Sequence, residues 1–184
     1  RGWRMQVHIS SAQDVDLAMQ VSSLTSHEID IFALLLDAVI GGAGDLGGGV
    51  LALDACHTDA RRFGELVASR LDSWPWAGWK IDSRHRHDET NPAVSAASVL
   101  AKVERDEQVR TLEAELEVPI VSGYPSAAKT REAFSTRLAG VEPWDPLRWG
   151  CATIAEAWKA SHGSAVPLRP LDGRFRPGQQ RLSL

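Results

Sequence analysis

Hydrophobic positions along the chain follow two different periods, which predict strands and helices in turn. Short apolar runs predict strands at residues 5–9 (MQVHI), 50–54 (VLALD) and 78–83 (GWKIDS). Apolar residues three and four positions apart predict helices at residues 12–23, 25–40, 59–71, 92–117, about 127–139 and about 147–162. Strands that alternate with helices are typical of α/β folds.

Two of the predicted helices carry sequence signals at their first turn. Thr25 and Glu28 have the spacing of a capping box, in which each side chain accepts from the backbone amide of the other residue. Asn91 is a favourable N-cap, and Pro92 follows it at a position where a missing amide costs nothing. A long helix is therefore expected to begin after Asn91.

The long helix has one polar stripe and one apolar stripe. Ser95, Ser98 and Lys102 fall on one face, where hydroxyls and a cation could contact a phosphodiester. The alternative is close packing of small residues against a sheet, with Lys102 paired to Asp106 one turn later. Three apolar residues of the same helix are expected to point into the core: Val99, Leu100 and Val103.

Composition narrows the class of protein only moderately. The chain has 184 residues, 43% of them hydrophobic, which is enough to bury the core of one domain. We expect this domain at residues 1–163 and a flexible tail at residues 164–184. The net charge of −4 means that any nucleic-acid contact depends on a local patch. Cys56 and Cys151 have neither disulfide nor zinc spacing, and no apolar run could span a bilayer, which together favour a reducing cytoplasm.

Asp54 and Asp88 are the strongest candidates for chemistry. Asp54 closes a buried strand, and Asp88 stands shortly before the long helix. Such carboxylates can converge at one edge of an α/β sheet and bind Mg²⁺ or Mn²⁺, which prefer hard oxygen ligands. The alternative is that Asp54 is an exposed strand end and Asp88 a capping or turn residue.

Two further motifs have open interpretations. His85 and His87 could belong to a zinc site or be solvated loop histidines. Tyr124, in the turn SGYPS, could stack on a sugar or base, or be a buried structural residue.

Taken together, these segments resemble the type 2 ribonuclease H family, and its archaeal-like ribonuclease HII branch in particular. The resemblance runs through TSHEIDIFA, LDACHTDARRFGELV, HRHDETNPAVSAASVLAKVERDEQV and SGYPSAAKTREAF. It implies a ribonuclease H-like mixed sheet flanked by helices, with a C-terminal helical portion. It also implies two-metal hydrolysis of the RNA strand of RNA–DNA hybrids, with cleavage at ribonucleotides embedded in duplex DNA and products carrying 5′-phosphate and 3′-hydroxyl ends.

The resemblance carries over to particular residues. Asp54 matches the acid that closes the central strand of the family, and Asp88 the acid before the Ser/Ala-rich helix; both would be ligands of Mg²⁺ or Mn²⁺. Tyr124 matches the tyrosine set against the ribose at the RNA–DNA junction. Ser98 and Lys102 fall in the helix of the motif, where backbone contacts to the nucleic acid are implied.

The sequence also departs from the family pattern. The family opens with a strand that ends in Asp-Glu-Ala-Gly-Arg-Gly and supplies two of its four acids, and no such motif occurs here, so we expect the first strand or strands to be missing. Ala127 stands where the archaeal pattern usually has Asp. The isolated chain is therefore expected to be a poor catalyst.

Three alternatives follow from this departure. The chain could bind hybrids without cutting them, or it could need a partner chain that supplies the missing acids. It could also be an unrelated α/β domain whose loop histidines bind zinc.

The C-terminal RFRPGQQRLSL could dock on a clamp-type partner.

Overall fold

The computed structural model describes residues 3–41, 47–117 and 138–170. Within these residues the chain divides into two compact units, each with its own hydrophobic core. The first unit contains residues 3–9, 22–41 and 47–101, and the second contains residues 10–21, 102–117 and 138–170.

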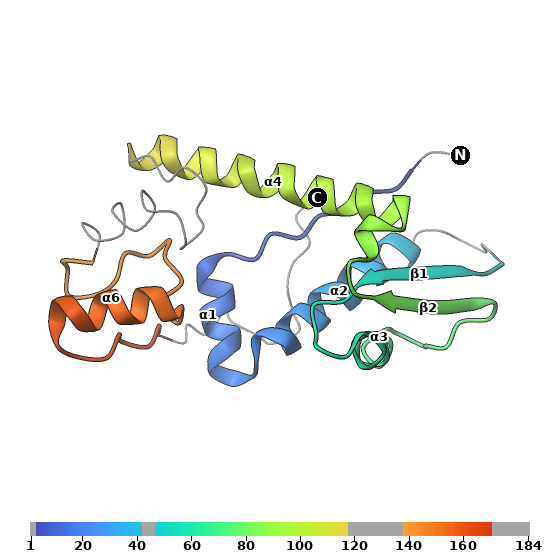
Figure 1. The fold of residues 1–184 in the computed structure, drawn as a ribbon, viewed down its shortest axis with the longest axis horizontal. Coiled ribbons are helices and arrows are strands. Elements are labelled where there is room, and N and C mark those ends of the chain that lie inside the picture. Colours follow the sequence, from blue (N-terminus) through green and yellow to red (C-terminus); the bar gives the residue numbers. More distant parts are fainter. Residues whose placement is uncertain (1–2, 42–46, 118–137, 171–184) are drawn as a thin grey trace. The chain divides into compact units, whose positions relative to one another are not determined.

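The first unit is built on two parallel strands, β1 (Gly49–Asp54) and β2 (Trp79–Arg84), which lie side by side in Figure 1. Asp54 is in register with Arg84, and the pairing extends past the strand through a hydrogen bond from the Ala55 amide to the Arg84 carbonyl (2.9 Å). Both strands therefore end at the same edge, which is where α/β sheets usually place their chemistry. The predicted strands at 50–54 and 78–83 are confirmed.

Helices α2 (Leu24–Gly41) and α3 (Ala60–Ala68) cover one face of this sheet. Leu51 and Leu53 alternate along β1 and are buried against them, as a strand with a single covered face requires. The core that the two helices share with β1 contains Ile29, Leu53, Phe63 and Val67. This packing of helices on a parallel pair confirms the α/β fold class.

Gly64 lets α3 approach β2 closely. A Cβ atom at this position would lie 2.9 Å from the Ser83 Cβ and 3.1 Å from the Ile81 Cγ2. Such separations are shorter than ordinary van der Waals contact, so only glycine fits without a shift of the strand.

Two helix starts can be compared with the predictions. Helix α4 (Pro92–Leu116) begins after Asn91, whose Oδ1 accepts from the Ala93 amide (3.0 Å), so this N-cap is confirmed. The predicted capping box of Thr25 and Glu28 is wrong, because α2 begins at Leu24 and the Ser23 hydroxyl accepts from the Ser26 amide (3.1 Å). The helix starts one residue earlier than predicted because Ser23 is an equally suitable cap.

Two further predictions fail in the first ten residues and in α4. Residues 5–9 form neither helix nor strand, because β propensity yields a strand only where a neighbouring strand completes the ladder. The three apolar residues expected in the core are instead exposed, with Val99 at 55%, Leu100 at 36% and Val103 at 59%. Of the described residues in α4, Val94 near its start is the buried hydrophobic one.

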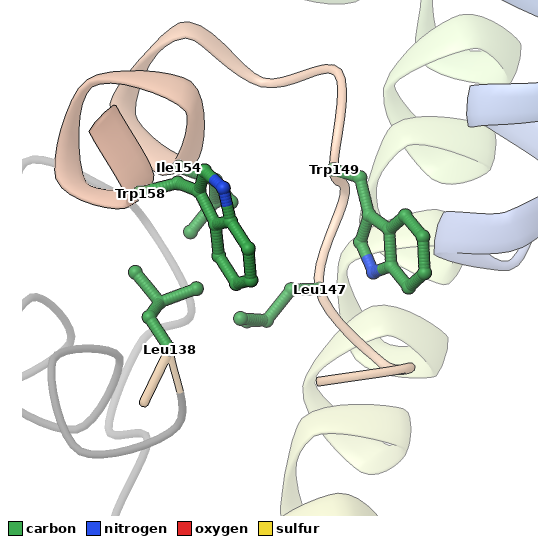
Figure 2. Packing of buried hydrophobic residues seen from close by; sticks show 5 residues of the cluster. All are labelled: Leu138, Leu147, Trp149, Ile154 and Trp158. Carbon is green, nitrogen blue, oxygen red and sulfur yellow. The ribbon is translucent and has the colours of Figure 1, made fainter. Parts of the chain in front are cut away.

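The described part of the second unit gathers its core around α6 (Ala152–His162), and it also contains α1 (Ala12–Val21) and the later part of α4. Figure 2 shows Ile154 and Trp158 projecting from α6 toward Leu138 and Leu147, with Trp149 to one side. The helix predicted at about 147–162 thus begins later, after Cys151.

A buried ion pair joins distant parts of the second unit. Asp16 in α1 and Arg169 are only 5% and 4% exposed, and the Arg169 Nε donates to the Asp16 Oδ2 at 2.8 Å. The guanidinium also lies 4.3 Å from the centroid of the Trp149 ring. Arg169 belongs to the segment that the sequence predicts to be a flexible tail, yet it is among the most buried side chains described.

Some predicted features lie outside the described residues. These are most of the helix predicted at about 127–139 and the end of the predicted tail, residues 171–184. Within the residues that are described, no helix combines the length and apolarity that crossing a membrane requires.

Candidate active site

Asp54 occupies the carboxyl end of β1, where the strand leaves the core. Leu53 before it is buried, whereas Asp54 is partly exposed. Its Oδ1 accepts a hydrogen bond from the backbone amide of His87 (3.1 Å). No other hydrogen bond to this carboxylate is identified in the described structure, so lone pairs remain for a further ligand.

Asp88 lies in η1 (His87–Glu89), a single turn between β2 and α4. The turn starts from Arg86 in the left-handed conformation (φ 54°) and closes through hydrogen bonds from the Thr90 and Asn91 amides to the His87 carbonyl (3.2 and 2.9 Å). Asp88 is therefore the next residue after the one whose amide contacts Asp54. The structure brings the two aspartates to the same edge of the sheet, and their role as metal ligands stays a prediction.

Other ionisable groups near this edge are already engaged. Asp82 accepts two hydrogen bonds from Arg84 (2.7 and 2.8 Å), and these bonds hold the pKa of Asp82 below its usual value. Partial burial of the thiol raises the pKa of Cys56 to about 12, and the carboxylate of Glu28 adds to the rise. Cys56 is thus a protonated thiol at neutral pH, and thiolate is the form that binds soft metals.

The two histidines of the loop lie in different environments. His85 is exposed, as a solvated loop histidine would be, but His87 is only 3% exposed, so the solvated interpretation is wrong for it. Its ring packs against β1, with Nδ1 3.2 Å from the Leu53 carbonyl oxygen. In the described ranges no three His, Cys, Asp or Glu side chains cluster closely enough to hold a metal.

The start of α4 has little free capacity for an anion. Pro92 has no amide hydrogen, Asn91 accepts from the Ala93 and Val94 amides (3.0 and 3.4 Å), and the Ser95 amide donates to the Asn91 carbonyl (2.9 Å). A phosphate at this helix would therefore depend on side chains rather than on the first backbone amides.

Ser98 and Lys102 are the side chains of α4 predicted to contact nucleic acid. They stand one helical turn apart, with Ser98 partly exposed and Lys102 exposed. Asp106, the partner considered for Lys102, instead accepts from Arg105 (3.1 Å). Tyr124 and Ala127 lie outside the described residues.

The sequence is similar to a known protein family and to curated members of it. The sequence profile described as Ribonuclease HII matches residues 49–144, which include Asp54, Asp88 and all of α4. The ribonuclease HII of Pyrococcus furiosus is 33% identical over 127 residues, covering 69% of this chain and 51% of that protein. The ribonuclease HII of Methanococcoides burtonii is 33% identical over 133 residues, covering 71% of this chain and 58% of that protein. The chain thus spans about half the length of the curated relatives it matches.

Solved structures show the same fold. The ribonuclease H2 of Pyrococcus horikoshii superposes with a TM-score of 0.67 at 22% identity, covering 84% of this chain and 68% of that one. The ribonuclease HII in a complex with PCNA from Archaeoglobus fulgidus gives a TM-score of 0.60 at 21% identity, covering 89% of this chain and 68% of that one.

Proposed function

The chain belongs to the ribonuclease HII family, and we propose that it is part of an endoribonuclease acting on RNA–DNA hybrids. The proposed reaction is hydrolysis of the RNA strand of a hybrid and cleavage at single ribonucleotides in duplex DNA, leaving 5′-phosphate and 3′-hydroxyl ends. The observation that carries the proposal is the family match over residues 49–144, which contains both aspartates at one edge of the sheet.

Asp54 and Asp88 would hold Mg²⁺ or Mn²⁺. Their chemistry fits such ions, because both are partly exposed carboxylates and hard cations prefer oxygen donors. When bound, divalent metals supply positive charge at the phosphate and an activated water. The protein would contribute the position of the two carboxylates, one of them already oriented by the His87 amide.

Ser98, Lys102 and Tyr124 would position the nucleic acid. Lys102 can neutralise a phosphate, and Ser98 can donate a hydrogen bond to one, contacts that set register without reading sequence. Tyr124 would stack against the ribose at the RNA–DNA junction. Hybrid binding should then weaken as salt rises, because phosphate contacts release counterions.

A second candidate function is binding without cleavage. One observation favours it: in the part of the chain that is described, no three acids, histidines or cysteines cluster as a metal site. The chain would then bind hybrids, or cut them only when another polypeptide segment supplies further acids.

Cleavage of a labelled duplex that contains one ribonucleotide separates these functions. The 184-residue chain is incubated with Mn²⁺ beside a fusion that adds the Asp-Glu strand with which the family opens. We expect the fusion to cut next to the ribonucleotide and the chain alone to cut poorly. Asp54→Asn and Asp88→Asn in the fusion should each reduce the rate by about 10²–10³-fold.

Asp72→Asn is the matched control. Asp72 is an exposed carboxylate in the loop that leads to the start of β2, away from the edge that carries Asp54. The control should cut at the wild-type rate, and an all-DNA duplex should stay intact. Full activity in both Asp54→Asn and Asp88→Asn would refute the metal assignment. Salt-sensitive binding without cleavage by the fusion would favour the second function.

A clamp-type partner is a further part of the proposal. The similar ribonuclease HII of Archaeoglobus fulgidus forms a complex with PCNA. We propose that RFRPGQQRLSL at the C-terminus of this chain docks on a sliding clamp. Calorimetric titration with the clamp of the source organism should give heat for the full chain and none after removal of residues 174–184. Equal heat from the shortened chain would refute the docking role of this segment.

A further inference from the structure

His87 is a buried residue in an otherwise exposed loop. Arg86 before it and Glu89 after it are exposed and paired with each other (2.6 Å), whereas the His87 side chain is enclosed. Its Nδ1 lies 3.2 Å from the Leu53 carbonyl oxygen. Because a carbonyl oxygen can only accept, Nδ1 carries the hydrogen of this bond. The ring therefore ties the loop to the last buried residue of β1.

The backbone of His87 makes the adjoining contacts. Its amide donates to the Asp54 Oδ1 (3.1 Å), and its carbonyl accepts from the Thr90 and Asn91 amides. One residue thus binds two successive residues of β1 and also closes the turn into α4. Because Asp88 is the next residue, its Cα lies about 3.8 Å from that of His87, so the position of Asp88 relative to Asp54 depends on this attachment.

We propose that His87 is a positioning residue that sets the spacing of Asp54 and Asp88 for divalent metal, an inference that rests on the proposed function. The ring does not act as a ligand, since Nδ1 is committed to Leu53 and the enclosed ring holds Nε2 3.8 Å from the Asp82 Oδ2. Its effect passes through the two carboxylates. Partners that orient metal ligands in this way commonly change metal affinity by about 10–100-fold when they are removed.

The test uses the ¹⁵N-labelled 184-residue chain and Mn²⁺, whose paramagnetic broadening detects weak binding residue by residue. His87→Leu fills a similar space but removes the donor to Leu53. His87→Asn keeps an N–H at the position of Nδ1. His85→Leu makes the same chemical change at an exposed histidine two residues away.

We expect His87→Leu to weaken Mn²⁺ binding at Asp54 and Asp88 by about 10–100-fold. His87→Asn should restore most of the affinity, and His85→Leu should leave it unchanged. Hydrogen exchange gives a second reading that needs no metal. The amides of residues 87, 90 and 91 should lose protection in His87→Leu and regain it in His87→Asn, while the amides of β1 and β2 keep theirs.

The outcomes distinguish the positioning role of His87 from the proposed metal site at Asp54 and Asp88. Wild-type Mn²⁺ affinity and exchange in His87→Leu would overturn the positioning role and leave the metal site intact. A wild-type chain without Mn²⁺ broadening near Asp54 and Asp88 would overturn the metal site, and the positioning role with it. Loss of affinity that His87→Asn does not restore would also overturn the role of the Nδ1 donor.

Discussion

Asp16 and Asp54 are both placed by a hydrogen bond from a distant backbone amide, but their surroundings differ. The Asp16 carboxylate is buried and accepts from the Trp149 and Gly150 amides (2.7 and 3.0 Å) as well as from Arg169. The Asp54 carboxylate is partly exposed and accepts from the His87 amide (3.1 Å). A carboxylate whose oxygens are all engaged fixes a fold, whereas one with a free lone pair can still bind a ligand.

The two sites also differ in what a missing partner would leave behind. Arg169 donates to the Leu147 carbonyl (2.6 Å) as well as to Asp16, so removing it would leave both buried acceptors without this donor. The Asp145 carboxylate, which also accepts from Arg169 (2.5 Å), is exposed and would return to water. Loss of a ligand from Asp54 would return that carboxylate to water. Stability should therefore depend on Asp16 and metal binding on Asp54.

The largest effect is expected from Arg169→Ala. This change leaves the Asp16 charge buried without its partner, and the free energy of unfolding should fall by about 3–5 kcal/mol. Denaturant unfolding followed by tryptophan fluorescence measures it. The double variant Asp16→Leu/Arg169→Met removes both charges and should lose less than Arg169→Ala alone. A larger loss in the double variant would contradict this account of the pair.

Asp54→Asn should leave stability almost unchanged but abolish Mn²⁺ binding. The asparagine oxygen can still accept from the His87 amide, so the free energy of unfolding should change by less than about 1 kcal/mol. Mn²⁺ broadening near residue 54 should nevertheless disappear, because the amide carries no charge. A stability loss as large as that of Arg169→Ala would remove the contrast between the two sites.

Asn91→Ala tests how much the N-cap of α4 contributes to stability. The Asn91 side chain caps the Ala93 and Val94 amides, and its removal should cost about 1 kcal/mol of stability. Asn91→Asp keeps an acceptor and should retain the wild-type value. Thermal unfolding of the three proteins provides the measurement. Equal midpoints for Asn91→Ala and wild type would show that the cap is dispensable.

The smallest effect concerns the Cys56 thiol beside Asp54. Its pKa is raised to about 12, so the retained proton stabilises the folded chain below the ordinary thiol pKa of about 8.5, and this contribution is lost as pH rises through about 12. Glu28→Gln should lower the pKa without restoring the ordinary value, since burial is the larger cause. Alkylation rates against pH in a Cys151→Ser background test this. A pKa unchanged by Glu28→Gln would refute the contribution of Glu28.

Features encoded within a few residues could be predicted from the sequence. The strand that ends at Asp54 follows from a short apolar run, and the start of α4 follows from Asn91 and Pro92. Asp54 and Asp88 could be expected at one edge because Asp54 ends one strand of an α/β sheet and Asp88 follows the next strand. Asp88 is also the neighbour of His87, whose amide donates to Asp54. This arrangement depends on the left-handed conformation of Arg86, which could not be predicted from the local sequence.

Features that depend on distant contacts could not be predicted in this way. His87 has the sequence context of a solvated loop residue, because the Leu53 carbonyl that accepts from it lies 34 positions earlier. The exposure of Val99 and Leu100 could not be read from their spacing, since periodicity shows which residues share a face and not what covers it. The Ser23 cap was missed because Thr25 offered a competing signal in the same short segment.

Gly64 shows how an absent methyl group can constrain sequence variation at a distance. It contacts neither aspartate, yet an alanine there would press on Ser83, five positions before Asp88. An exposed α3 residue such as Arg61 meets no such steric limit, whereas position 64 tolerates no side chain unless β2 moves. Redesign of this protein should therefore hold residue 64 fixed before altering anything at the edge that carries Asp54 and Asp88.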